Sequence, residues 1–184
     1  MQNIVVVDEH DNVVGEEEKD KCHDGGGILH RAFLAMVFNS EGELLLARRS
    51  AGKRLWPGYW DGTVASHVTK GEDYEQASRR RLAEEIGIED ARVQYLFKFQ
   101  YKAGYKDIGT EHEICAVTVA NNIDAGSVLP DGNEISDIRF MGIDALVADI
   151  RNSREPYTPW LLLAIEHLQM RHLLKPDLRM PLTA

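Results

Sequence analysis

One segment with an unusual order of charges constrains this chain more than any other feature of its sequence. Residues 73–86 carry apolar side chains at Ala77, Leu82 and Ile86, and Gly87 stands where a helix would end. This spacing is typical of one apolar face of a helix, and a glycine is the usual C-terminal cap. The other positions hold mostly arginine and glutamate. The segment therefore predicts a helix that buries one face and presents paired charges on the other.

The segments around this helix predict strands followed by two more helices. Apolar runs bounded by turn residues predict strands in these ranges: 4–7 with 13–14 as an opening hairpin, 29–38 with 43–49 as a second hairpin, then 63–68, 91–101, 113–120 and 138–141. Helices are expected at 144–151 and 158–174, the second with Pro159 near its start and Pro176 beyond its end. We therefore expect an α/β (α+β) domain with a mixed sheet.

Length, charge and cysteine content narrow the class of protein. A chain of 184 residues can form one core without disulfides or an obligate partner, so we expect a single domain and a monomer. A net charge of −9 and a pI near 5.2 argue against a non-specific nucleic-acid binder, so an anionic substrate must meet a local basic patch. The two cysteines, Cys22 and Cys115, have no paired spacing and no signal sequence precedes them, which favours the cytoplasm. No apolar run approaches the roughly 20 residues of a membrane span.

The charged run of the predicted helix is similar to the Nudix box, whose pattern is G-x5-E-x7-R-E-U-x-E-E-x-G-U with U a bulky aliphatic residue. With Gly87 set on the last glycine, the matching positions are Glu72, Arg80, Leu82, Glu84, Glu85 and Ile88. Ser66 replaces the first glycine, and Arg81 replaces a glutamate that would join a magnesium-binding cluster. So many matches favour this interpretation over an ordinary amphipathic helix with a solvated charged face.

The resemblance implies a Nudix fold, in which a mixed β-sheet is sandwiched between helices. The whole chain, residues 1–184, would form one such domain. Its expected parts are an N-terminal hairpin at 3–15, a core at 28–174 and a C-terminal tail at 175–184.

A more specific resemblance, to type I isopentenyl-diphosphate isomerase, covers about residues 3–174 and accounts for Arg81, because that family uses the Nudix scaffold with an altered box. Five residues match the positions at which that family binds its active-site divalent metal: His23, His30, His67, Glu111 and Glu113. Three imidazoles with two carboxylates suit Mn²⁺, Zn²⁺ or Fe²⁺ better than an all-oxygen calcium site. Any one histidine alone would be better explained as an ordinary core or surface residue, so the interpretation depends on the set.

The same resemblance implies a site for the substrate's diphosphate. The cations at the matching positions are Lys19, Arg49, Lys53 and Arg81. Arginine can grip phosphate oxygens through a bidentate fork, whereas lysine acts as a mobile point charge. Glu85 matches the residue that holds an additional Mg²⁺ bridging the diphosphate. For Arg49 and Lys53 the alternative is a hairpin end kept soluble by its charges.

The reaction of that family moves a double bond by adding one proton and removing another, through a tertiary carbocation. Trp160 matches the tryptophan whose ring faces the cationic carbon, a cation–π arrangement that strengthens when water is excluded. Tyr101 matches a tyrosine near the proton-transfer site, and Glu113 would transfer a proton on one face of the alkene. Both aromatic residues have the alternative role of ordinary core side chains.

The resemblance breaks at Ala65, where the family carries a catalytic cysteine. Strand alternation directs the hydroxyl of Ser66 to the other face of the sheet, and a hydroxyl is a weak acid. Cys115 would share a face with Glu113, on the metal side, where a small buried thiol is the commoner role. Cys22 could approach only from a loop, and we do not expect it to act. Three explanations stay open: an engineered cysteine-to-alanine isomerase, a natural homologue that protonates through Tyr101 or an ordered water, or a relative with another reaction on a similar isoprenoid diphosphate.

The function implied is the metal-dependent 1,3-allylic isomerisation of isopentenyl diphosphate to dimethylallyl diphosphate. One alternative is a Nudix hydrolase of a nucleoside or other diphosphate, which Glu84 and Glu85 favour but Arg81 and Ser66 oppose. The other is a catalytically silent diphosphate-binding homologue, whose main support is Ala65.

Overall fold

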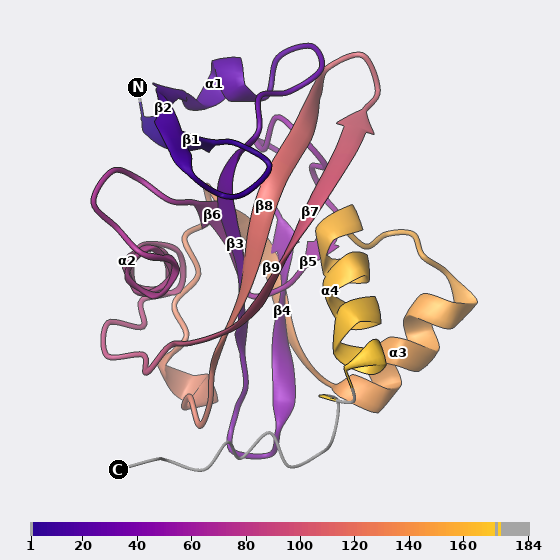
Figure 1. Cartoon of the computed structure of the whole chain (residues 1–184). Coiled ribbons are helices and arrows are strands. Elements are labelled where there is room, and N and C mark those ends of the chain that lie inside the picture. The colour runs from indigo at the N-terminus through magenta and orange to yellow at the C-terminus, as the bar shows by residue number, and fades with distance from the viewer. Residues whose placement is uncertain (1, 172, 174–184) are drawn as a thin grey trace.

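The computed structural model describes residues 2–171 and residue 173, and these form strands, helices and one 3-10 turn (Figure 1). The strands are β1 (Asn3–Val7), β2 (Val13–Glu18), β3 (His30–Val37), β4 (Glu43–Arg49), β5 (Trp60–Asp61), β6 (Val64–His67), β7 (Gln94–Tyr105), β8 (Gly109–Ala120) and β9 (Ile135–Gly142). The helices are α1 (Lys19–Cys22), α2 (Tyr74–Ile86), α3 (Ile143–Asn152) and α4 (Pro159–Met170), and the 3-10 turn is Ala125–Ser127.

The strands form two sheets. The larger has the order β2-β1-β3-β8-β7, with β6 also paired to β3, and the smaller has the order β5-β4-β9. Strands β3 and β8 run parallel while their other neighbours are antiparallel, so the larger sheet is mixed, as the sequence predicts. The register of the parallel pair brings His30 directly beside Glu113.

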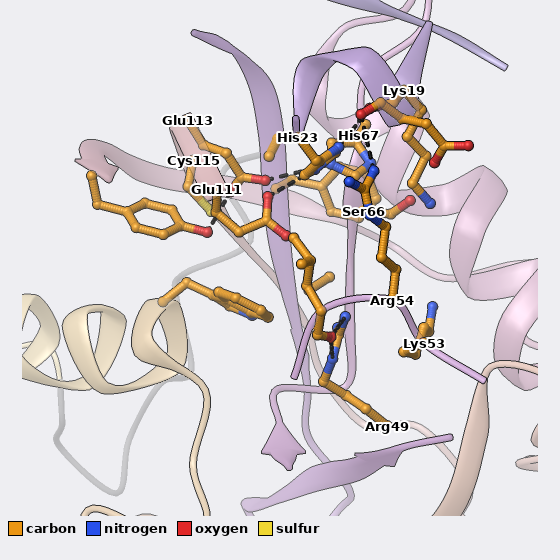
Figure 2. Close-up of a pocket in the computed structure, with 17 residues that line it drawn as sticks. Lys19, His23, Arg49, Lys53, Arg54, Ser66, His67, Glu111, Glu113 and Cys115 are labelled. Atoms are coloured by element: carbon orange, nitrogen blue, oxygen red, sulfur yellow. Dashed lines mark hydrogen bonds and ion pairs between the residues drawn. The ribbon is translucent and has the colours of Figure 1, made fainter. Parts of the chain in front are cut away.

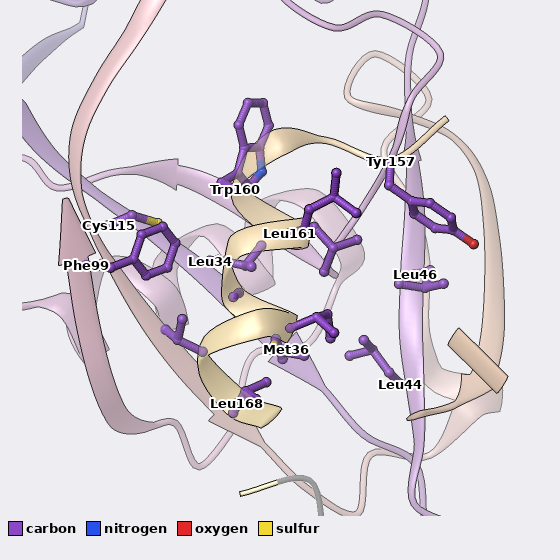
Figure 3. Packing of buried hydrophobic residues seen from close by; sticks show 14 of the residues in the cluster. Leu34, Met36, Leu44, Leu46, Phe99, Cys115, Tyr157, Trp160, Leu161 and Leu168 are labelled. Carbon is purple, nitrogen blue, oxygen red and sulfur yellow. The ribbon is translucent and has the colours of Figure 1, made fainter. Parts of the chain in front are cut away.

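Alternation along the strands divides the apolar residues between two faces. On β3, Leu34 and Met36 face one cluster, which includes Trp160 and Leu161 of α4, while Phe33 and residues of like parity join a second cluster with α2. Figure 1 shows the consequence, with α2 on one side of the sheets and α3 and α4 on the other. Figure 3 shows the first cluster, in which α4 packs on side chains from β3 and β4.

Helix α2 begins and ends where the sequence predicts. Asp73 accepts a hydrogen bond from the backbone of Gln76 (2.7 Å), and the side chain of Gln76 accepts one from the backbone of Asp73 (2.9 Å), which completes a capping box. At the other end Gly87 has φ +73°, and a Cβ there would lie 3.2 Å from Cβ of Leu129. Both the left-handed backbone and the close approach therefore require glycine.

Several sequence predictions need correction. The predicted hairpin of 29–38 with 43–49 turns as expected, and Phe38 bridges Leu44, but β3 and β4 then diverge into different sheets. Both strands carry apolar side chains on both of their faces. Each strand can therefore be buried on two sides within its own sheet, and this burial does not require β3 to pair with β4. The last helix ends at Met170, short of the predicted 174. Pro176 and the predicted tail lie outside the described residues.

The other predicted elements are confirmed with shifted ends. The opening hairpin extends to Glu18, and strands β7 and β8 are each 12 residues long. Over the part of the chain that the structure describes, none of the helices has the length and apolar character that crossing a membrane requires.

Candidate active site

Three histidines and two glutamates from four separate segments meet in one cluster. Figure 2 labels His23, His67, Glu111 and Glu113 of this cluster. They are His23, which follows α1, His30 of β3, His67 at the end of β6, and Glu111 and Glu113 of β8. All five are buried, and one possible ligand atom from each lies within 4.8 Å of those of the others. The strand register produces this meeting, because β3 pairs residue 30 with residue 113 and residue 32 with residue 67.

Hydrogen bonds at the back of two rings orient the histidines. Nδ1 of His23 lies 2.6 Å from the carbonyl oxygen of Lys19, and Nδ1 of His30 lies 2.7 Å from that of Ile28. A carbonyl oxygen only accepts, so each Nδ1 must carry the proton and donate it. In the neutral rings this leaves the Nε2 lone pairs directed at the centre of the cluster, as metal ligands require.

The cluster has buried lone pairs that its own residues leave without partners. Nε2 of His30 and both ring nitrogens of His67 have no hydrogen-bond partner among the described residues. Nε2 of His23 lies 2.8 Å from Oε2 of Glu111, a distance that requires a proton or a cation between two acceptors. Unpaired buried polar atoms are costly. The five residues therefore fit a divalent metal ion, which would satisfy them together.

The charges of the cluster suit metal binding. Burial lowers the pKa of His67 well below its usual value, and the neighbouring His30 and Lys19 act in the same direction. Its ring is therefore neutral and free to ligate. Burial opposes ionisation of Glu113 as well, but the neighbouring ring of His30 and the hydrogen bond from Tyr101 hold the pKa of this carboxyl below its ordinary value. A neutral imidazole beside an ionised carboxylate is the protonation state in which both types of side chain bind metals.

A cleft opens beside the cluster and encloses about 660 Å³ of space, its open mouth included. The structure brings to its wall the following residues that the sequence singles out: Lys19, His23, Arg49, Lys53, Ala65, His67, Tyr101, Glu111, Glu113 and Trp160. Arg54, which the sequence does not single out, also lines it. Figure 2 shows Arg49, Lys53 and Arg54 on the side of the cleft away from Glu113.

Tyr101 and Glu113 face each other on neighbouring strands of the cleft wall. The hydroxyl of Tyr101 donates to Oε2 of Glu113 at 2.7 Å, and the two residues are direct partners across β7 and β8. Burial raises the pKa of Tyr101 well above its usual value, and the charge of Glu113 adds to this. The ring of Trp160 lies 6.2 Å from that of Tyr101. Aromatic faces and a carboxylate therefore lie together on one side of the cleft.

Arg81 and Glu85 lie in a second charged group, apart from the five-residue cluster. Arg81 donates to Oε1 of Glu85 from both Nε (2.9 Å) and Nη2 (2.6 Å), and to Glu84 from Nη1 (2.7 Å). Its Nη2 also lies 3.3 Å from Oε1 of Glu134, which in turn pairs with Lys53. Glu134 is thus the link between two of the predicted diphosphate cations.

Burial shifts the pKa values of Glu85 and the nearby Lys19 in the directions that favour their neutral forms. Burial raises the pKa of Glu85 in spite of Lys53 and Arg81. Burial also lowers the pKa of Lys19, and the charge of Lys53 adds to this effect. Several cations held this close together favour an anionic ligand.

Among the residues that the structure describes, no thiol occupies the place that the family's cysteine would take at position 65. Ala65 lies opposite Leu34 and lines the cleft, while Ser66 lies opposite Phe33 and points to the α2 side, although part of it also reaches the cleft wall. Cys115 lines the cleft as well, on the same sheet face as Ala65, and burial raises the pKa of its thiol well above the usual value. Burial raises the pKa of Cys22 to about 11, and this residue is not on the cleft wall.

The sequence analysis did not predict a role for two carboxylates near the cleft, those of Glu134 and Asp61. Glu134 belongs to a loop that the sequence shows only as acidic, and it is 81 residues from its partner Lys53. Asp61 lies in an aromatic, glycine-rich segment and is 99 residues from its partner Trp160. The only local signal for Asp61 was a single carboxylate between Trp60 and a glycine. The contacts of Glu134 with Lys53 and of Asp61 with Trp160 join residues too far apart in the sequence for a local pattern to predict them.

Comparisons with known proteins agree with this geometry. Residues 28–161 match the NUDIX domain family. The chain is 41% identical over 161 residues to "Isopentenyl-diphosphate Delta-isomerase 1" of Photorhabdus laumondii, which covers 87% of this chain and 90% of that protein. It is 36% identical to "Isopentenyl-diphosphate Delta-isomerase" of Haloarcula marismortui, with 92% of each chain covered.

A solved structure supports the fold independently. The protein DR0079 of Deinococcus radiodurans is similar with a TM-score of 0.73 and 25% identity, over 90% of this chain and 98% of that one. The MutT protein of Methanosarcina mazei has a TM-score of 0.60 at 19% identity, over 80% and 96% of the two chains, which is a likeness of fold. The matched domain, the full-length relatives and the shared architecture show that this chain has a single-domain Nudix fold and belongs to the isopentenyl-diphosphate Delta-isomerase family of enzymes.

Proposed function

We propose that this protein interconverts isopentenyl diphosphate and dimethylallyl diphosphate by a metal-dependent 1,3-allylic isomerisation. The observation that carries this proposal is the double role of Glu113. It belongs to the buried five-residue cluster, and it also accepts the hydrogen bond of Tyr101 on the wall of the cleft. A carboxylate suited to proton transfer therefore shares the cleft wall with aromatic rings and with the cations Lys19, Arg49 and Lys53.

The cations of the cleft support a diphosphate as the charged part of the substrate. Lys19, Arg49 and Lys53 line the cleft, and Arg81 joins Lys53 through Glu134. In a chain with net charge −9, such a local concentration of cations is selective for an anion. We assign the diphosphate to these four cations and an additional Mg²⁺ to Glu85, next to them.

The apolar part of the substrate would then lie toward Trp160 and Tyr101. Trp160 is only 3% exposed, so the surrounding protein shields its ring from water. A π face in such a place stabilises a tertiary carbocation. The high pKa of Tyr101 keeps the proton on its hydroxyl, which donates to Glu113, so the ionised carboxylate is the base of this pair and the tyrosine positions it. This pair is the proton-transfer unit that we assign.

The five-residue cluster would hold the catalytic metal, for which Mn²⁺, Zn²⁺ and Fe²⁺ fit the mixed nitrogen and oxygen ligands. When bound, such an ion supplies a fixed positive charge that keeps Glu113 ionised and in one orientation. Ala65 supplies no proton, so a second transfer must use Tyr101 or an ordered water. A cytoplasmic monomer stays our prediction from the sequence.

The test is to follow isopentenyl diphosphate with the protein, Mg²⁺ and Mn²⁺ in deuterated water by proton and phosphorus NMR. We expect dimethylallyl diphosphate with deuterium incorporated, and a loss of rate of about 10²-fold or more in Glu113→Gln, because general acid–base groups contribute that much. Glu166→Gln, which changes an exposed carboxylate paired with Arg154, is the control that should keep the rate.

Other outcomes would support the competing functions. Release of phosphate without isomerisation would make the protein a hydrolase, although Arg81 already engages both Glu84 and Glu85, the carboxylates that a Nudix hydrolase would use for Mg²⁺. An unchanged spectrum would indicate a silent diphosphate-binding homologue. In that case Ala65→Cys, which places a thiol on the cleft wall, should be tested for restored turnover.

A further inference from the structure

Asp61 is a buried carboxylate that lies behind the cleft and connects its two functional halves. It is 3% exposed and does not itself line the cleft. Its Oδ1 accepts three hydrogen bonds, from Nε1 of Trp160 (2.7 Å), Oγ1 of Thr158 (3.0 Å) and the backbone of Gly62 (2.8 Å). Its Oδ2 accepts one from Nη1 of Arg49 at 3.2 Å. All four partners donate, so both oxygens act as acceptors, as those of an ionised carboxylate do. Burial raises the pKa of Asp61, and the charge of Arg49 and the other three donors oppose that rise.

The Oδ1 side of Asp61 sets the orientation of Trp160. Thr158 is the residue before α4, and Trp160 lies in the first turn of that helix. Two side-chain donors from this turn converge on one oxygen atom, so the indole plane cannot rotate without breaking a buried hydrogen bond. The ring that we assign to the cationic carbon is therefore fixed from behind.

The Oδ2 side of Asp61 faces a cation that also contacts the same ring. Nε and Nη2 of Arg49 donate to the carbonyl oxygens of Leu55 and Trp56, and its Cζ lies 5.1 Å from the ring centre of Trp160. A guanidinium at this distance draws on the same π electrons that would stabilise a substrate carbocation. Its full charge would also repel that carbocation.

We propose that Asp61 is a positioning residue that supplies the counter-charge for Arg49 and holds Trp160, so that a cation of the diphosphate site can lie beside the carbocation site. This inference rests on the proposed function. Without the carboxylate, the Arg49–Trp160 contact would oppose the positive charge that develops on the substrate. With it, Arg49 and Asp61 form a pair of little net charge whose remaining N–H groups still serve the diphosphate.

The substitution Asp61→Asn separates the two roles. An asparagine keeps an oxygen for the donors of Trp160, Thr158 and Gly62 and presents an uncharged amide to Arg49. The ring should then stay in place while the counter-charge is lost. Tryptophan fluorescence and the melting temperature report whether the ring and the fold are kept. Thr158→Val is the matched control, because it removes one donor to the same carboxylate but leaves the charge.

The decisive measurement is a ratio of two affinities by calorimetry, one for inorganic pyrophosphate and one for 2-(dimethylamino)ethyl diphosphate. The ammonium group of the second ligand imitates the cationic carbon. For Asp61→Asn we expect pyrophosphate affinity to change by less than about 3-fold, and affinity for the ammonium ligand to fall by about 10-fold or more. Thr158→Val should change the ratio by less than about 2-fold. An equal change for both ligands in Asp61→Asn would overturn the proposal.

The same ratio keeps the inference separable from the proposed function and from a folding defect. Binding needs no turnover, so a wild type that fails to isomerise would overturn the function while the ratio still tests Asp61. If Asp61→Asn does not fold, Arg49→Gln tests the pair from its other side. It should weaken pyrophosphate binding more than binding of the ammonium ligand, and the opposite order would contradict the role of Asp61.

Discussion

At the scale of single residues, the proposed diphosphate site already contains a carboxylate of the protein that pairs with its cations. Glu134 lies between Lys53 and Arg81, and the hydrogen bond and charge of Lys53, followed by those of Arg81, lower its pKa despite partial burial. It is therefore an anion held by two of the cations that we assign to the substrate. A diphosphate that uses these cations must compete with it.

We predict that Glu134→Gln binds inorganic pyrophosphate about 3- to 10-fold more tightly than the wild type, because a neutral amide competes less for Lys53 and Arg81. Calorimetric titration at constant ionic strength measures this. Glu166→Gln removes an exposed carboxylate elsewhere and should leave the affinity unchanged. Weaker binding in Glu134→Gln, seen only with Mg²⁺ present, would show instead that Glu134 helps Glu85 to hold that ion.

At the scale of elements, one ion pair fixes the approach to α2. Glu72 precedes the helix and accepts two hydrogen bonds from Arg80, from Nε at 2.6 Å and from Nη2 at 2.9 Å. Thr69 donates to it as well, from its backbone and its hydroxyl. Burial alone would raise the pKa of Glu72, but the bonds from Arg80 and Thr69 lower it to about 2.

This shift predicts how stability depends on pH. The pKa of Glu72 is lower in the folded chain than its ordinary value of 4.5, so the ion pair contributes fully above about pH 4.5 and is lost as the pH falls toward about 2. Glu72→Gln should cost about 1 kcal/mol at pH 7, and the difference from the wild type should shrink below pH 4.5. Urea denaturation at pH 7, 5 and 4 measures it. The exposed Glu89→Gln is the control, and a difference that is the same at all three pH values would contradict the assignment.

At the scale of the whole molecule, the metal cluster ties together segments that are distant in the sequence. Its ligands come from the end of α1 and from β3, β6 and β8, so an ion bound there would cross-link both edges of β3. A ligand that binds only the folded state stabilises it by mass action. The cluster should therefore affect global stability as well as activity.

We predict that Mn²⁺ or Zn²⁺ raises the melting temperature of the chelator-treated protein. At 100 times the dissociation constant the gain is about 2.7 kcal/mol, which corresponds to roughly 5–10 °C for a chain of this size. His67→Ala should abolish the rise, whereas the exposed His10→Ala should keep it. A wild type whose melting temperature does not respond to either ion would argue against a metal in this cluster.

Much of the architecture could be predicted from short-range patterns. The boundaries of α2 follow from Asp73 and Gly87, whose capping contacts involve residues within a few positions of each other. The sequence also predicted which residues of a strand share a face, because side chains alternate between the two faces of any extended chain. The predicted pairing of β3 with β4 was wrong because pairing partners depend on which faces the helices cover, and no local pattern records that.

The candidate site was predicted unevenly for the same reason. The family resemblance singled out five residues that the structure brings into one cluster, and four of these line the cleft together with three of the four cations. Glu134 and Asp61 were missed because their contacts with Lys53, Arg49 and Trp160 join loops and strand ends far apart in the chain. Their importance comes from burial and from the charges around them, which exist only in the folded protein.

The sequence by itself thus determined the elements, the family and the kinds of side chain available for chemistry, because propensity, capping and motif spacing act over a few residues. Only the tertiary structure decided which charges meet. Coulombic and hydrogen-bond energies depend on distance and on exclusion of water, and both are set by how β3, β6, β8 and α4 pack around the cleft. The pairing of Asp61 with Arg49 behind Trp160 is a consequence of that packing.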